Sequence, residues 1–267
     1  MRVILSRKGF DAENGGIPSA IMPDGTMLSF PIPSYERYGF KDLQYDGTTY
    51  EKLLGQLSSK YFGSTCHIDP DLTDKFRVRT PKGWKPAFGQ CGASDSFLAN
   101  TAGIKKDDLF LFFGSFRMIE KDSRGHYSYV RKGDFPVGHE IHVVWGYLQV
   151  GGMLTEKEEI KKYRWHPHAD ERFYDGQRNT LYIPTETLTF NDNLPGCGVF
   201  DFDEKRILTL QGKTKGIWKD NPVYRPENII GNRKNSAKKE GIYYSGIWQE
   251  LPLRETKEAE RWAKSLF

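Results

Sequence analysis

The chain has 267 residues, 37% of them hydrophobic and 14% aromatic, which is enough to bury a full core. A mean hydropathy of −0.64, with no apolar run near the roughly 20 residues that span a bilayer, argues against a helical membrane protein. The net charge of +4 is weaker than a dedicated duplex-DNA-binding domain usually carries, and it is compatible with anionic small ligands.

The three cysteines, Cys66, Cys91 and Cys197, are odd in number, and none belongs to a CxxC pair. This usage fits a reducing compartment and argues against a disulfide framework or a structural zinc finger. The chain opens with the strand pattern MRVILS rather than with a basic and then apolar secretory signal. We therefore expect a cytoplasmic protein.

The opening strand runs into a glycine-rich polar loop, a common position for a ligand site. Ser6, Arg7, Lys8 and Asp11 place a hydroxyl, two cations and a carboxylate within this stretch. They are candidate ligand-binding and catalytic residues. The alternative is a capped surface turn with no ligand.

A helix is predicted from Tyr50 to about Ser59, capped by Thr48 or Thr49. In the following connection, His67, Asp69 and Asp71 occupy alternate positions, and Pro70 favours an extended Asp69. An extended backbone would point all three side chains the same way, as acid–base chemistry or metal binding requires. The alternative is that Asp71 caps a turn and His67 is partly buried.

The small residues of Phe88 to Asp95 precede a predicted helix from Asp95 to Ala102, ending at Gly103. Backbone N–H groups before a helix can bind an anion, and Gln90 adds an amide to this loop. Cys91 is interpreted as a packed side chain rather than a nucleophile.

The continuous apolar run from Asp107 to Gly114 predicts a strand buried on both faces, with Arg117 at its end as a further candidate ligand. A second strand is predicted from His139 to Gly152, with Trp145 and Tyr147 on one face. Two such strands are similar in pattern to the small barrels of PUA-like domains.

A charged helix is predicted from Leu154 to Tyr163, followed by a surface loop that contains His166 and His168. Neither this histidine pair nor His139 and His142 has the spacing of a zinc site, and no metal ligands are assigned. The chain closes with a predicted helix, residues 256–266. The pattern indicates a single α+β domain over residues 1–267, with a mixed or barrel-like central sheet flanked by a few helices.

Six segments resemble the family called nucleotide modification associated domain, third type. They are SRKGFD (6–11), GGIPSAIMPDGTMLSFPIP (15–33), HIDPDL (67–72), FGQCGASDSFLAN (88–100), DLFLFFGSFR (108–117) and HVVWGYLQVG (142–151). The resemblance implies a bacterial or phage protein linked to nucleotide processing or nucleic-acid base modification. It therefore implies a nucleotide or a nucleic acid as the partner.

The first functional hypothesis is a protein that binds a nucleotide or base and uses a carboxylate and histidine cluster for catalysis. The candidate catalytic residues are Asp11, His67, Asp69 and Asp71, and the candidate ligand-binding residues are Ser6, Arg7, Lys8, Gln90 and Arg117. One alternative is a non-catalytic PUA-like reader of modified bases, with Trp84, Trp145 or Tyr147 in an aromatic cage. Another is a structural partner in a phage-defence or modification complex. The sequence does not identify a cofactor or an oligomeric state.

Overall fold

The computed structural model describes residues 1–174 and 176–267. Its central sheet follows the order β19 (Glu250–Pro252), β1 (Val3–Arg7), β9 (Leu109–Lys121), β11 (Ile141–Leu154), β12 (Asn179–Pro184) and β8 (Phe88–Cys91). β1 and β2 (Ser19–Ile21) run parallel to β9, whereas β11 and β19 pair antiparallel with their neighbours. The protein is therefore α+β with a mixed sheet, as expected. Over residues 1–174 and 176–267 the sheet is open, with β19 and β8 at its two ends, and these residues do not form the expected barrel.

β9 forms the centre of this sheet and is buried on both faces, as its apolar run predicts. Leu109, Leu111 and Phe113 pack into one hydrophobic cluster, and Phe110 and Phe112 pack into another on the opposite face. The strand continues as far as Lys121. Arg117 therefore lies inside the strand, and its predicted position at the strand end is wrong.

β11 does not keep the simple alternation that its sequence predicts. Its register against β9 shifts between Val144 and Gly146, which marks a bulge. Trp145 lies at this irregularity and packs in the same cluster as Leu148, while Tyr147 packs with Val144 in the other. The prediction that Trp145 and Tyr147 share a face is wrong, because one extra residue inverts the alternation.

Two helices begin at the threonines that the sequence indicates. The Thr49 hydroxyl accepts the N–H of Lys52 at the start of α1 (Tyr50–Leu57). The Thr256 hydroxyl accepts the N–H of Ala259 at the start of α4 (Lys257–Ser265). Each bond satisfies one of the free N–H groups of a first helical turn.

Two other helices differ from the prediction. α2 (Gly92–Phe97) begins three residues early and continues as the π-helical η2 (Leu98–Ala102), which ends at left-handed Gly103 as expected. α3 covers only Lys157–Ile160. The longer helix predicted there does not form, because Leu154 still belongs to β11 and pairs with Leu181 of β12.

The remaining strands are short: β3 (Met27–Leu28), β4 (Ile32–Pro33), β5 (Gln44–Tyr45), β6 (Thr48–Thr49), β7 (Cys66–His67), β10 (Tyr127–Tyr129), β13 (Thr187–Leu188), β14 (Asn191–Pro195), β15 (Cys197–Val199), β16 (Ile217–Trp218), β17 (Ser236–Lys238) and β18 (Gly241–Tyr243). Short 3-10 turns are η1 (Phe40–Asp42), η3 (Pro167–Ala169), η4 (Glu171–Phe173), η5 (Glu204–Arg206), η6 (Pro222–Tyr224) and η7 (Pro226–Asn228).

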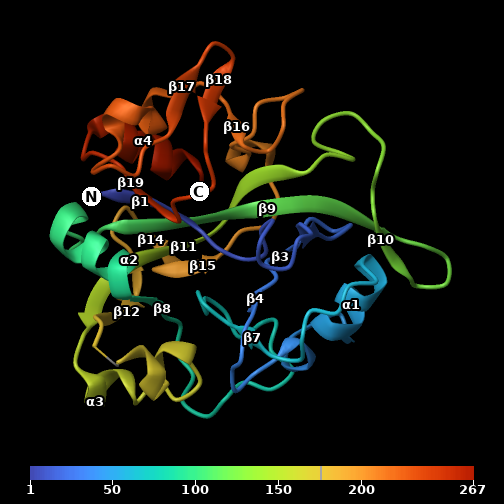
Figure 1. Cartoon of the computed structure of the whole chain (residues 1–267), viewed down its shortest axis with the longest axis horizontal. Coiled ribbons are helices and arrows are strands. Elements are labelled where there is room, and N and C mark those ends of the chain that lie inside the picture. The colour runs from blue at the N-terminus through green and yellow to red at the C-terminus, as the bar shows by residue number, and fades with distance from the viewer. Residues whose placement is uncertain (175) are drawn as a thin grey trace.

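In Figure 1, β9 crosses the middle of the molecule. The C-terminal elements β16 to β18 and α4 lie on one side of it, and α1, β4 and β7 lie on the other. No helix within the two described ranges has the length and apolarity needed to cross a membrane.

Candidate functional site

Two neighbouring side chains and one from a distant part of the chain meet at one point: His67, Asp69 and His168. One ligand atom from each lies within 4.8 Å of the other two. His67 ends β7, and the N–H of Asp69 donates to the carbonyl of His67 at 2.9 Å, which folds residues 67–69 into a tight turn. His168 lies on η3, where its N–H donates to Nδ1 of His166.

Asp69 is the anion of this group, and its side chain is only 2% exposed. Its Oδ1 accepts the backbone N–H of Gly89 at 2.6 Å and lies 3.3 Å from Nε2 of His166. Its Oδ2 lies 3.7 Å from Nζ of Lys8. Burial disfavours the charged carboxylate, but the contact with His166 and the charge of Lys8 outweigh it and hold the pKa of Asp69 well below its usual range. Asp69 is therefore ionised at neutral pH.

Each histidine of the group is oriented by an acceptor on its Nδ1 side. His67 Nδ1 lies 2.9 Å from Oε1 of Glu36. Burial alone would raise the pKa of Glu36, but its contacts with His67 and Arg172 lower it. An ionised carboxylate has no proton to donate, so Glu36 accepts the hydrogen bond. His168 Nδ1 lies 2.7 Å from Oδ1 of Asn179, whose Nδ2 donates to the His168 carbonyl. Nδ1 is therefore the donor in both rings, and in a neutral imidazole this tautomer leaves the lone pair on Nε2.

Burial determines the charge state of His168. It lowers the pKa of this imidazole to about 3, because the nearby Asp69 carboxylate offsets only part of the desolvation. His168 is therefore neutral at physiological pH. A neutral imidazole can accept a proton or bind a metal ion.

The group opens into a polar pocket of about 140 Å³. The pocket is lined by Arg7, Lys8, Gly9, Asp11, Asn14, Ile32, His67, Asp69, Gly89, Gln90, Cys91, His168, Phe173 and Gln249. Its volume lies below the roughly 300–1,000 Å³ typical of small-molecule sites. It therefore suits a single base or a phosphate group rather than a whole dinucleotide.

The two cations of the pocket differ in how firmly they are held. The guanidinium of Arg7 donates to Asp11 at 2.8 Å and to the carbonyl of Gly246 at 2.9 Å. Lys8 has looser contacts: its Nζ lies 3.7 Å from Asp69 and 3.9 Å from Oε1 of Glu250. Lys8 is therefore the less firmly bonded of the two cations.

The wall beside His168 depends on close packing. A Cβ atom at Gly89 would lie 2.4 Å from the His168 ring, so only glycine fits there. The His168 ring also stacks on Phe173 with centroids 4.6 Å apart. Phe173 is itself part of the pocket lining.

Six of the nine predicted site residues line this pocket: Arg7, Lys8, Asp11, His67, Asp69 and Gln90. Asp11 also closes its own turn, because its Oδ1 accepts the N–H groups of Glu13 and Asn14. Gln90 donates its side-chain amide to the buried carboxylate of Glu250. These two residues therefore have structural roles as well as positions in the wall.

The other three predicted residues lie elsewhere. Asp71 is buried, and its Oδ2 accepts from Arg77 at 2.6 Å and from Trp84 Nε1 at 2.8 Å. The expected alternation of His67, Asp69 and Asp71 fails because the backbone turns at 67–69 instead of staying extended. Ser6 is buried within β1, and Arg117 lies within β9 opposite Ala20.

Sequence reasoning missed the third member of the group. His166 and His168 were expected in a surface loop, but they are only 2% and 3% exposed, so that expectation is wrong. The sequence also did not identify the residues that contact the members of this group, which are Asn179, Glu36 and His166. Their partners lie up to about a hundred residues away, and no local spacing identifies such contacts.

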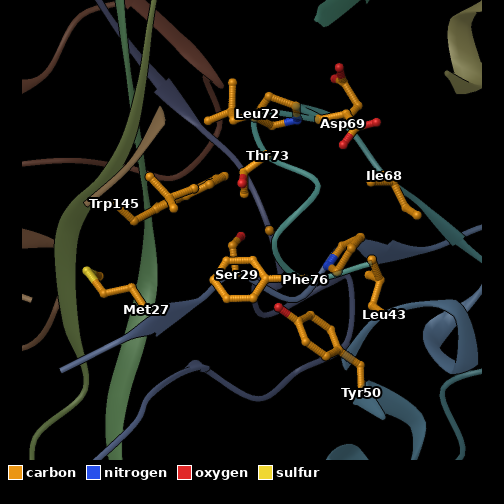
Figure 2. Close-up of a pocket in the computed structure, with 15 residues that line it drawn as sticks. Met27, Ser29, Leu43, Tyr50, Ile68, Asp69, Leu72, Thr73, Phe76 and Trp145 are labelled. Atoms are coloured by element: carbon orange, nitrogen blue, oxygen red, sulfur yellow. The ribbon is translucent and has the colours of Figure 1, made fainter. Parts of the chain in front are cut away.

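A second cavity of about 60 Å³ shares Asp69 with the polar pocket (Figure 2). Figure 2 shows Tyr50, Phe76, Leu72 and Trp145 around it. Its lining is mostly apolar, and it is small. We therefore interpret it as a packing space rather than as the ligand site.

The open mixed sheet makes this an α+β protein, and its polar pocket holds an ionised carboxylate, two oriented imidazoles and two cations. The chain belongs to the family described as nucleotide modification associated domain 3, whose model matches residues 2–263. Comparisons with the curated proteins and with the solved structures give no match.

Proposed function

We propose that the polar pocket binds a nucleotide or a nucleic-acid base and takes part in its chemical modification. The observation that carries this proposal is the meeting of His67, Asp69 and His168 beside Lys8 in one pocket. Membership in a nucleotide-modification family supports the choice of substrate class.

The pocket offers complementary groups for each part of such a substrate. Lys8 can pair with a phosphate as a point charge, and Phe173 adds an apolar part to the pocket wall. The side chains of Gln90 and Gln249 supply amides that can hydrogen-bond to the edge of a base. The imidazoles can accept a proton at Nε2, while Asp69 remains an anion.

The alternative of a non-catalytic reader has less support. Trp145 and Tyr147 are 4% and 5% exposed and pack in different hydrophobic clusters, so they do not form a cage together. Trp84 donates its Nε1 to Asp71, outside the polar pocket. The predicted cage is not formed by these three residues.

Calorimetry with nucleoside monophosphates, nucleoside triphosphates and short single-stranded DNA and RNA tests the binding. We expect Lys8→Met to weaken binding about tenfold or more by removing a partly buried charge contact. Lys132→Met, at an exposed position, serves as the matched control. Equal affinity in Lys8→Met and the wild type, or no binding at all, would contradict the proposal.

Modification is tested separately from binding. Nucleic acid incubated with the protein is digested to nucleosides, which are then analysed by mass spectrometry. We expect an altered nucleoside with the wild type and none with Asp69→Asn. Binding that persists in Asp69→Asn without any altered nucleoside from either protein would favour the reader.

A further inference from the structure

We infer that His67, Asp69 and His168 form a binding site for one divalent first-row transition-metal ion. The proposed ligand atoms are Nε2 of each histidine and Oδ2 of Asp69. This inference deepens the proposed function, since it adds a metal ion to the same pocket. It stands on geometry that is independent of any nucleotide.

The first argument is that both imidazoles are prepared as ligands. Metal-binding histidines characteristically donate their other ring N–H to a carboxylate or carbonyl oxygen, which sets the tautomer and the ring orientation. Here Glu36 accepts from Nδ1 of His67 at 2.9 Å, and Asn179 accepts from Nδ1 of His168 at 2.7 Å. Asn179 is itself fixed through its donation to the His168 carbonyl at 2.9 Å.

The second argument concerns the carboxylate. Oδ1 of Asp69 is held by the N–H of Gly89, and it also faces His166. Oδ2 has looser contacts, since it lies 3.7 Å from Nζ of Lys8 and 4.0 Å from Nε2 of His67. The backbone contact therefore fixes the carboxylate with Oδ2 on the side of His67.

The spacing of the three residues surrounds a single point. Three atoms bonded to one ion at about 2.1 Å lie about 3.4 Å apart in tetrahedral geometry. Here one ligand atom of each residue lies within 4.8 Å of the other two, and Nε2 of His67 lies 4.0 Å from Oδ2 of Asp69. Closing around an ion therefore requires these separations to shrink by up to about 1.4 Å.

The donor set indicates the class of ion. Two imidazoles with one carboxylate suit Fe(II), Mn(II), Co(II) or Zn(II), whereas Mg²⁺ and Ca²⁺ prefer oxygen ligands throughout. Three protein ligands leave coordination positions open, and these face the pocket that Lys8 and Gln90 line. A substrate bound in this pocket could therefore reach the ion directly.

Lys8 makes the inference sharply testable. Its ammonium lies 3.7 Å from Oδ2 of Asp69, so it competes with a metal ion for the same carboxylate. Removing this charge should tighten metal binding several-fold. The same Lys8→Met change should weaken binding of a phosphate-bearing ligand, so the two effects have opposite signs.

The experiment is a titration of the chelator-treated full chain with Co(II) and Zn(II), without nucleotide, followed by visible absorption and calorimetry. We expect one ion per chain, binding weakened at least a hundredfold in His67→Ala and Asp69→Asn, and a several-fold gain in Lys8→Met. His139→Ala should bind like the wild type, because His139 is an exposed histidine outside the ligand set.

Thermal unfolding checks that each variant is folded. Lys8→Met adds a variant whose affinity for the metal ion is expected to rise, which misfolding would not produce. No ion bound by the wild type, or binding unaffected by His67→Ala, would overturn the inference. Nucleotide binding by the chelator-treated, metal-free protein would then still support the proposed function. Metal binding without nucleotide binding would overturn the proposed function alone.

Discussion

The backbone of Gly89 joins the two halves of the candidate site: its N–H donates to Asp69 at 2.6 Å, while its α-carbon lies against the ring of His168. Gly89 pairs with Leu181 of β12, so the position of both side chains is tied to the central sheet. The site is therefore positioned by a paired strand rather than by its loops alone.

Gly89→Ala should disrupt the site, because the new methyl group would lie 2.4 Å from the His168 ring. We expect ligand or metal binding to fall at least tenfold, together with a loss of about 1–3 kcal/mol in the free energy of unfolding from overpacking. Calorimetry and urea unfolding measure the two effects. Gly152→Ala, where no atom lies near the added Cβ, is the control. Unchanged binding in Gly89→Ala would show that ligand or metal binding does not depend on the packing of the His168 ring against Gly89.

Asp71→Asn should affect stability rather than the site. Asp71 and Arg77 form a buried ion pair, and burial, only partly offset by Arg77, raises the pKa of Asp71. Neutralising Asp71 leaves the Arg77 charge buried and unpaired, at a cost of about 3 kcal/mol. Urea unfolding measures this loss, and exposed Asp192→Asn should cost less than about 0.5 kcal/mol. Loss of ligand binding in a well-folded Asp71→Asn variant would show that Asp71 contributes to the site after all.

His142 should make the protein less stable as the solution is acidified. Burial lowers its pKa to about 3, from an ordinary value of 6.5, and its Nδ1 accepts from Trp218. Between these pKa values the unfolded chain binds a proton that the folded chain does not, so stability falls as pH falls from 6.5 toward 3. This contribution is at most about 1.4 kcal/mol per pH unit and is absent above pH 6.5.

Urea unfolding at several pH values tests this expectation. His142→Gln should flatten the decline in stability between neutral and acidic pH, since glutamine does not titrate. Exposed His139→Gln should leave the decline as it is in the wild type. A decline of the same steepness in His142→Gln and the wild type would assign the acid sensitivity to other groups.

Thr256→Ala should destabilise the protein by about 1 kcal/mol, because it removes the hydroxyl that accepts the first-turn N–H of Ala259 in α4. Thr256→Ser keeps that hydroxyl and should restore most of the loss. Thermal unfolding distinguishes the two variants. Equal stability of the alanine and serine variants would mean that this cap contributes nothing measurable.

Local sequence was sufficient for the elements whose signals are contained within a few residues. The apolar run of β9 predicts a strand buried on both faces, and Thr49 and Thr256 mark the helix starts correctly. α3 was predicted too long, since Leu154 belongs to a strand through its pairing with β12. The bulge in β11 was not predictable either, because it depends on the register against a partner strand.

The sequence by itself determined that one short stretch supplies His67 and Asp69, and that a cation follows the first strand at Lys8. Only the tertiary structure decided that His168 completes the group and that Asp71 leaves it. The physical reason is that a site of this kind depends on distances between segments far apart in the chain. Those distances are set by sheet register and by a hydrogen bond at the 67–69 turn, and no local residue pattern encodes them.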